Sequence, residues 1–434
     1  MSYLSEYRRP RALSPLREHL RDTFWFAPIA AMAAVFLLWW GCAELDEAII
    51  ASLKDSREHE AVRELMGIAE DAKTIVTTVS SAMLTFIGVV FSISLVALQM
   101  AIGQLSPRIV RIFIRSRITK ATFSVFLATF LLSLLVLTSY DAAADPRLVS
   151  TVPLVQSLLT LVMVLLSLLL FVAYVNSTLR LMRVAHVVDR IATESFRVLD
   201  KTPRSEAGVA EGLGEPAEYV MHRGRAGVVR DVDVALLVRA ARRYGVVLRL
   251  VPRIGDFVVP GTPLLAVHGG RLRRRLRSTV YVGVERTFHQ DLGFGLRQLA
   301  DIGLRALSPA VNDPTTAVQC LDRIVQFLAA VARRPLGTVG HLDHEGVARL
   351  VQDVPGFTDL VDLGFTELRG CAPGNPQISR RMLAGLDDLL TLAPEERREP
   401  LLRHRALLVA IVERTTLEPA DRAFALEADR QGIG

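Results

Sequence analysis

Four long stretches without a charged side chain dominate the hydrophobic pattern in the first half of the chain. A helix needs about 20 apolar residues to cross the hydrocarbon core of a bilayer, and every stretch reaches that length. We therefore predict four transmembrane helices over residues 24–179, after a cytoplasmic N-terminal tail of residues 1–23. The uncharged stretches are Thr23 to Ala43, Thr74 to Pro107, Ala121 to Tyr140 and Leu148 to Leu179.

The charges between these stretches predict the direction of the helices. The segment from Ala43 to Lys73 is rich in Asp and Glu, whereas the segment from Arg108 to Lys120 carries five basic residues and no acid. Lys and Arg collect in short cytoplasmic segments, so we place both termini in the cytoplasm. The acidic segment then lies outside, either as a solvated loop or as a ring that attracts cations in an assembly of subunits.

The fourth stretch continues into a pattern typical of an amphipathic helix. Arginines recur every seven residues from Arg183 to Arg197 among apolar neighbours, which predicts one helix from Pro153 to Leu199 that leaves the membrane as a stalk. Gly and Pro are frequent after this helix, as in a linker. Residues 180–216 are therefore predicted to be a stalk helix and linker. The second stretch is also longer than a bilayer requires, which predicts a tilted helix or one that projects into the cytoplasm.

Short alternating patterns predict a small β-rich module over residues 217–283. The phrase from Gly255 to Leu265 resembles the turn of a biotinyl or lipoyl domain, but it lacks the lysine that carries the cofactor in such domains. The resemblance implies a shape only, and we expect no cofactor. The predicted strands are Gly227 to Asp233, Val246 to Val251, Phe257 to Val259 and Leu264 to Val267, and the predicted helix is Val234 to Tyr244.

The last part of the chain, residues 284–434, has a helical spacing of apolar residues with breaks at Pro and Gly. This pattern predicts a cytoplasmic helical bundle. The expected fold class is thus membrane α-helical, with four transmembrane helices and a cytoplasmic α+β region in which a small β-rich module precedes a helical bundle. The composition agrees, because 51% of the residues are hydrophobic and the mean hydropathy is +0.34.

Charge and cysteine content exclude several classes of protein. The net charge is +6 and the pI is about 9.5, but the arginines mostly flank the predicted spans, where topology and lipid headgroups account for them. Nucleic acid is therefore not an expected partner. The three cysteines are too far apart in sequence for a zinc site or a disulfide framework. We find no nucleophile elbow, Walker loop or HExxH motif, so we do not expect an enzyme.

One predicted membrane helix carries a stripe of polar residues. Polar side chains at seven-residue spacing, with others three residues beyond, form one helical face that we call the polar stripe. Such a stripe indicates either a pore lining built from repeated subunits or close packing between membrane helices. The pore-lining candidates are Thr78, Ser81, Thr85, Ser92 and Gln99.

A second candidate site lies in the predicted bundle. Arg297, Asp301 and Arg305 stand four residues apart and would line one helical face. Two guanidinium groups held by a carboxylate could bind an anionic cytoplasmic ligand; a ladder of ion pairs along the helix, within or between subunits, is the alternative. Asp313 and Pro314, a few residues later, are typical of a helix start.

Two further groups of residues fit ordinary surface roles. His341 and His344 have no third ligand nearby in the sequence and fall in a predicted loop, so we expect no metal site. The arginines from Arg271 to Arg277 form the densest basic run of the chain. Such a run is typical of a solvated face, with contact to anionic lipid as the alternative.

Several phrases resemble a known family. The segment from Gln290 to Ala317, together with Gly88 to Leu98 and Ser106 to Arg108, is similar to the bacterial membrane-protein family catalogued as domain of unknown function 2254. The resemblance implies four membrane helices and a cytoplasmic C-terminal region, and it implies no activity or cofactor. Because the family is bacterial, we expect the protein in the inner membrane of a bacterium.

The sequence leaves two kinds of function open. The first is a homo-oligomeric channel for ions or small solutes, with the polar stripe on the axis and the cytoplasmic modules controlling opening. The alternative is a membrane-anchored sensory or protein-binding module without a pore. No charged residue lies inside a predicted span, which disfavours ion-coupled transport.

Overall fold

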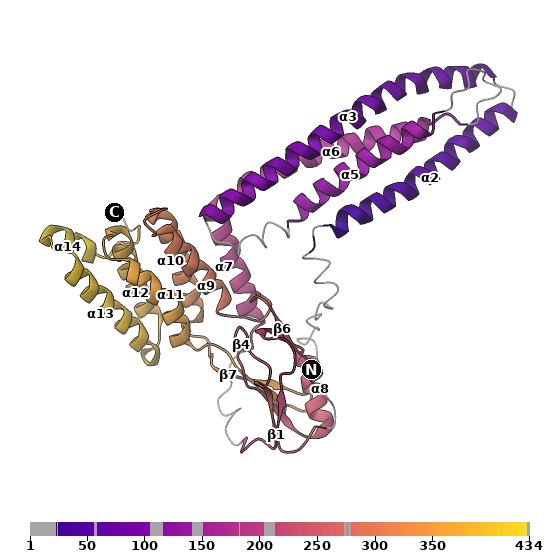
Figure 1. The fold of residues 1–434 in the computed structure, drawn as a ribbon. Coiled ribbons are helices and arrows are strands. Elements are labelled where there is room, and N and C mark those ends of the chain that lie inside the picture. The colour runs from indigo at the N-terminus through magenta and orange to yellow at the C-terminus, as the bar shows by residue number, and fades with distance from the viewer. Residues whose placement is uncertain are drawn as a thin grey trace. The chain divides into compact units, whose positions relative to one another are not determined.

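A computed structural model gives the fold of residues 23, 25–55, 59–104, 116–140, 151–181, 183–203, 213–272, 276 and 279–431. These residues form two compact units (Figure 1). The membrane unit contains the described residues up to Arg183, and the C-terminal unit begins at Val184. The predicted N-terminal tail, most of the basic segment after the second span and much of the predicted linker lie outside the described residues.

The membrane unit consists of long apolar helices, and four of the described helices are long and apolar enough to cross a bilayer. This confirms the prediction of four candidate spans. Half of the most apolar stretch of α5 is buried, whereas at most 17% of the corresponding stretch is buried in each of the other three helices. The α5 helix is therefore the central helix of the unit. The helices are α2 (Phe26–Asp55), α3 (His59–Gln104), α5 (Arg117–Thr138) and α6 (Leu154–Leu181).

The acidic segment between the first two spans is mostly helical rather than a loop. The α2 helix continues to Asp55 and α3 begins at His59, so most of the charged residues extend the two membrane helices. At 1.5 Å per residue, the 46 residues of α3 span about 69 Å. A large part of the extra length of this helix therefore lies at its acidic end. The sequence predicted either a tilt or a projection at the opposite, cytoplasmic end.

The predicted continuous stalk from Pro153 to Leu199 is wrong. The α6 helix ends at Leu181, and α7 (Val184–Lys201) is a separate helix of the C-terminal unit. Its apolar residues Val187, Val188 and Ile191 are buried in that unit, where α7 packs against α9 and α10. Asp189 of α7 also pairs with Arg323 at 2.9 Å. Burial of this apolar face makes α7 part of the C-terminal unit.

The first part of the C-terminal unit contains the predicted β-rich module. Its helix α8 (Val234–Tyr244) has the predicted bounds, because Asp233 caps its start and Gly245 ends it in a left-handed conformation. Figure 1 shows the strands beside α8. They are β1 (Glu218–Met221), β2 (Gly227–Val232), β3 (Val247–Leu250), β4 (Phe257–Val258), β5 (Pro263–His268) and β6 (Val280–Gly283).

A hairpin interrupts the region predicted to be helical throughout. Strands β7 (Thr338–Leu342) and β8 (Ala348–Asp353) complete a five-stranded sheet of order β1-β5-β3-β8-β7, next to a three-stranded sheet β4-β2-β6. Strand β8 pairs in parallel with β3, with Leu248 opposite Leu350. The sheet therefore takes strands from both sides of the predicted boundary at residue 283, and apolar residues under α8 form one core.

The remaining helices pack closely because glycines stand at their crossings. A Cβ atom on Gly295 of α9 would lie 1.8 Å from the Ser195 hydroxyl of α7, and one on Gly303 would lie 2.8 Å from Leu368 of α11. The helices of this bundle are α9 (Phe294–Ala306), α10 (Pro314–Val331), α11 (Phe357–Cys371), α12 (Pro376–Leu392), α13 (Arg398–Thr415) and α14 (Pro419–Leu426), with a short 3-10 helix at Glu395–Arg397.

Candidate functional site

The α3 helix packs onto its own unit along a single line of residues. Every seventh side chain from Val62 to Ala97 is buried, with at most 4% of its surface exposed. A seven-residue repeat keeps one helical face in contact with its neighbours over a long distance. We call this line the packed face of α3. It consists of Val62, Ala69, Val76, Met83, Val90 and Ala97.

The polar stripe lies on the opposite side of α3. Its members stand two or five residues after those of the packed face, which corresponds to about 200° and 140° around the helix. All five pore-lining candidates are exposed. Large apolar side chains, including Leu84 and Phe91, are exposed one residue after the packed face. The stripe therefore does not pack against another described helix of the same chain.

Part of the stripe satisfies its hydrogen bonds locally. The hydroxyl of Thr78 donates to the carbonyl of Thr74 at 2.9 Å, and that of Ser81 donates to the carbonyl of Thr77 at 3.2 Å. Such bonds lower the cost of a hydroxyl group in lipid. The amide of Gln99 has two donor hydrogens and one acceptor oxygen, and the carbonyls of its own helix cannot pair with the acceptor. Gln99 is thus the member of the stripe that most needs water or a partner.

A second polar line inside the membrane unit was not predicted from the sequence. Thr122 and Thr129 on α5 face Ser167 and the Leu170 carbonyl on α6, with a Thr129–Ser167 distance of 3.1 Å and a Thr122–Leu170 distance of 3.3 Å. These side chains are buried and join the two helices, as hydroxyl groups often do in membranes. Their seven-residue spacing, shared by Thr160, Ser167 and Tyr174, was the available signal.

Asp46 caps the α6 helix, a role that was not predicted from the acidic composition of its segment. Its carboxylate accepts hydrogen bonds from the backbone N–H groups of Val155 and Gln156 at 2.9 and 3.3 Å, and only 1% of the residue is exposed. A carboxylate at this position caps the start of α6 and opposes the positive end of the helix dipole. Asp46 is therefore not available for an acidic ring at an outer mouth.

In the C-terminal unit, the predicted anion clamp forms an ion-pair ladder. Arg297 contacts Asp301 on its own helix at 2.5 Å and Glu367 on α11 at 2.7 Å. These carboxylates raise the pKa of the Arg297 guanidinium, mainly through the hydrogen bond to Glu367. Arg305 lies on the same helix and is partly buried. The ladder joins α9 to α11, and binding of an anion by these residues stays a prediction.

The segment that resembles the known family joins the three-stranded sheet to the bundle. The side-chain amide of Gln290 pairs with the backbone of Val232 in β2, accepting from its N–H at 2.9 Å and donating to its carbonyl at 3.1 Å. Asp291, 3% exposed, receives both Arg286 contacts at 2.7 and 2.8 Å. Burial raises the pKa of the Asp291 carboxyl, while Arg286 opposes that rise. Asp313 caps α10 by accepting from the Thr316 N–H, as predicted.

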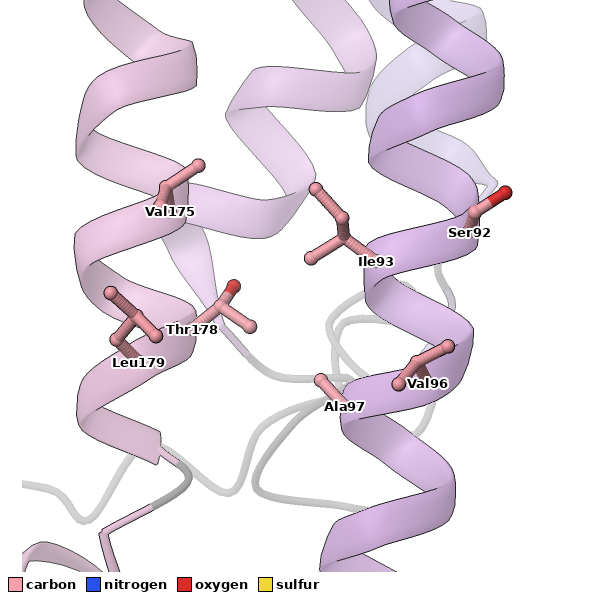
Figure 2. A pocket seen from close by; sticks show the side chains of 7 residues that line it. All are labelled: Ser92, Ile93, Val96, Ala97, Val175, Thr178 and Leu179. Carbon is pink, nitrogen blue, oxygen red and sulfur yellow. The ribbon is translucent and has the colours of Figure 1, made fainter.

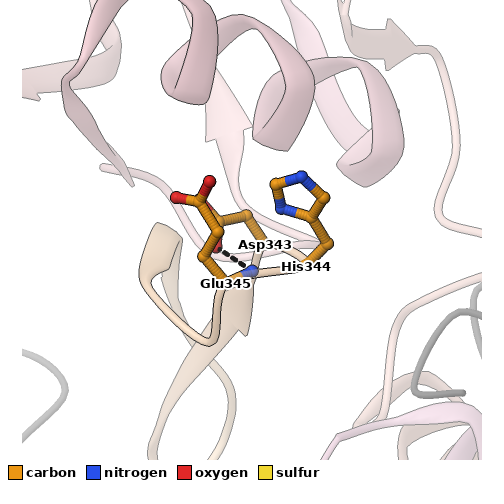
Figure 3. Close-up of side chains that lie close together, drawn as sticks. All are labelled: Asp343, His344 and Glu345. Atoms are coloured by element: carbon orange, nitrogen blue, oxygen red, sulfur yellow. Dashed lines mark hydrogen bonds between the residues drawn. The ribbon is translucent and has the colours of Figure 1, made fainter. Parts of the chain in front are cut away.

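The turn between β7 and β8 brings three possible metal ligands together, as Figure 3 shows for Asp343, His344 and Glu345. Asp343 already accepts hydrogen bonds from two backbone N–H groups and from Arg349 at 2.7 Å. Arg242 contacts the ring of His344 at 2.7 Å. Two guanidinium groups beside the cluster disfavour a bound cation, and His341 lies elsewhere, buried on β7. Of the basic run after Arg271, residues 273–275 and 277 lie outside the described residues.

Comparison with known proteins gives a family but no activity. A family model described as "Predicted membrane protein (DUF2254)" matches residues 21–388. The chain is 27% identical to uncharacterized proteins of Mycobacterium bovis and Mycobacterium tuberculosis, over 95% of its own length and 80% of theirs. No solved structure matches the chain. The function of the candidate sites must therefore be inferred from their geometry.

Proposed function

We propose, on the premise that this chain belongs to the family of membrane proteins catalogued as domain of unknown function 2254, that it forms a homo-oligomeric channel for ions or small solutes. In this proposal, α3 helices from several subunits surround a common axis. The polar stripe faces the axis and replaces part of the water around a permeating solute. The packed face of each α3 holds the helix on its own unit.

The exposure of the polar stripe, opposite the packed face, supports this proposal most strongly. Thr85, Ser92 and Gln99 occupy the outermost line of α3, where a monomer would present them to lipid. A polar side chain without a partner in hydrocarbon is unfavourable. In a ring of subunits, the same side chains face water, and the apolar Leu84 and Phe91 beside them are available for contact with neighbouring subunits or lipid.

We further propose that the C-terminal unit lies in the cytoplasm of a bacterial cell and controls opening. The acidic ends of α2 and α3 then lie outside, in agreement with the excess of Lys and Arg in the other segments. Labelling of intact cells with a membrane-impermeant thiol reagent tests the orientation. A cysteine in place of exposed Asp55 should react, and one in place of exposed Arg190 should react only after lysis. The reverse pattern would contradict the orientation.

Current measurements in planar bilayers test the channel. Purified protein should be oligomeric and should conduct, and Thr85→Phe should block the current because a large ring would enter the axis. Leu84→Phe, one residue away and equally exposed in the single chain, is the matched control and should conduct. A monomer without conductance, or equal currents in both variants, would contradict the channel and favour a membrane-anchored sensory or binding module.

A further inference from the structure

A groove of about 280 Å³ separates α3 from α6 near the basic end of α6. Figure 2 shows Ile93 and Ala97 of α3 pointing toward α6, whereas the hydroxyl group of Ser92 points away from it. Ser92 is thus the one member of the polar stripe that borders the groove, and its hydroxyl group is directed away from α6. The groove is lined by Ser92, Ile93, Val96, Ala97, Val175, Thr178 and Leu179.

The groove lies beyond the first residue of α5, so that α5 does not fill the space between α3 and α6. The Thr122 hydroxyl meets the Leu170 carbonyl at 3.3 Å, and α5 begins five residues earlier, at Arg117. Because α5 and α6 run in opposite directions, the start of α5 is about level with Val175. Past this level, α3 and α6 continue without the central helix between them, and their apolar side chains have no neighbour from α5.

Two basic residues follow the last groove-lining residue in the sequence. Arg180 and Arg183 follow Leu179, and both are exposed. Within the described part of the chain, no ion pair of either arginine is found. The backbone N–H of Arg183 donates to the carbonyl of Arg180 at 3.1 Å, so a turn holds both residues close to the groove. An apolar groove at membrane depth with two arginines at its end fits a molecule with a hydrocarbon chain and an anionic head.

We propose that this groove binds one acyl chain of an anionic phospholipid, whose phosphate contacts the guanidinium groups of Arg180 and Arg183. The lining from Val175 to Leu179 extends about 6 Å along α6, whereas a helix with its side chains is about 10 Å wide. The groove is therefore long enough for the part of an acyl chain next to the headgroup, and the arginines that follow it favour a lipid with an anionic head over an apolar helix of a second copy. The site does not depend on whether the polar stripe lines a pore.

Native mass spectrometry of the full-length protein tests this site. The protein is incubated in detergent with equal amounts of dioleoyl phosphatidylglycerol and dioleoyl phosphatidylcholine, and the retained lipids are counted. Wild-type protein should prefer phosphatidylglycerol. Leu179→Trp should lose the bound lipid because the ring fills the mouth of the groove. In the double variant Arg180→Gln, Arg183→Gln, the preference for phosphatidylglycerol over phosphatidylcholine should fall about 30-fold. The reason is that each arginine contributes about 1 kcal/mol near a headgroup.

Matched controls keep the test specific. Leu84→Trp adds the same ring to an exposed apolar position of α3 away from the groove, and Arg190→Gln removes an exposed arginine of the C-terminal unit; both should bind lipid as the wild type does. Circular dichroism confirms that each variant is folded. Equal phosphatidylglycerol binding by Leu179→Trp and Leu84→Trp would overturn the site. Loss of the oligomer in Leu179→Trp with unchanged lipid binding would also overturn it and would identify a subunit contact.

Discussion

Many polar side chains have partners within the C-terminal unit, whereas those of the polar stripe on α3 are exposed. In the C-terminal unit, charged groups such as Arg286, Asp291 and Arg297 have partners within the same unit at 2.5 to 2.8 Å. On α3, the polar stripe is directed away from every described helix of its own unit. The C-terminal unit can therefore be stable without an external partner for these groups, whereas the stripe indicates an environment that the single chain does not provide.

This contrast changes how the two candidate sites are ranked. From the sequence, the stripe of α3 could serve as a pore lining or as a packing surface, and the triad of Arg297, Asp301 and Arg305 could bind an anion or form an ion-pair ladder. The contact between Arg297 and Glu367 gives Arg297 a structural role between two helices. For the stripe, exposure excludes packing against the other described helices of the chain. Variants in the two regions should therefore differ in stability, with the larger losses in the C-terminal unit.

The largest loss of stability is expected from Arg286→Gln. This change leaves the Asp291 carboxylate buried without its charged partner, and breaking a buried pair in this way costs about 3 to 5 kcal/mol. The midpoint of thermal unfolding of the C-terminal unit, followed by near-ultraviolet circular dichroism of the full-length protein, should fall by about 10 °C. Arg253→Gln, which removes a largely exposed pair with Asp359, is the control. Similar midpoints for both variants would contradict the assignment of Arg286.

Acid should weaken the C-terminal unit through His341. Burial lowers the pKa of this imidazole from 6.5 to about 4. Above pH 6.5 the ring is neutral in both states, but as the pH falls toward 4 only the unfolded chain binds the proton, so stability decreases. The loss is roughly 3 kcal/mol. His341→Leu should unfold with a weaker dependence on pH between 6.5 and 4, and His344→Leu, at an exposed position, should keep the wild-type dependence.

Two glycine variants should have effects of opposite sign. Gly295→Ala places a methyl group 1.8 Å from the Ser195 hydroxyl and should destabilise the contact between α7 and α9 by about 2 kcal/mol. Gly370→Ala, in α11, meets no atom within 4 Å and should stabilise its helix by up to about 1 kcal/mol. Chemical unfolding of both variants measures the difference. A stabilising Gly295→Ala would contradict the close crossing of the two helices.

The smallest effect on stability is expected from the polar stripe. Thr85→Ala removes an exposed hydroxyl group and should change the free energy of unfolding by less than about 0.5 kcal/mol. Val90→Ala, on the packed face of the same helix, should destabilise the membrane unit by about 1 to 2 kcal/mol. Unfolding in detergent compares the two variants. A larger loss for Thr85→Ala would mean that the stripe carries packing rather than function.

The sequence predicted those elements whose signals are local. Uncharged length predicted the four membrane helices, and the local pattern of residues predicted α8 with the bounds that Asp233 and Gly245 give it in the structure. Long-range contacts were not predictable in the same way. The α7 helix resembles a stalk until α9 and α10 bury its apolar face, and β7 and β8 are recognised as strands only through their pairing with each other and with β3.

The same limit applies to the candidate site. Spacing placed the five stripe residues on one face of α3, but only the fold shows that this face lies opposite the packed face. The capping role of Asp46 and the ion pair of Arg297 with Glu367 join segments far apart in the sequence. A single sequence does not indicate which distant helix supplies such a partner.

Cysteine accessibility along α3 tests most directly whether the polar stripe faces water. In a background with Cys42 and Cys371 replaced by Ser, single cysteines at Thr85 and Ser92 are compared with single cysteines at Leu84 and Phe91. Protein in lipid vesicles is treated with a charged, membrane-impermeant thiosulfonate reagent. Our account predicts fast modification of the stripe cysteines and little modification of the flanking ones. Equal protection of all four positions would show that the stripe lies in lipid or in a dry interface, and would contradict the account.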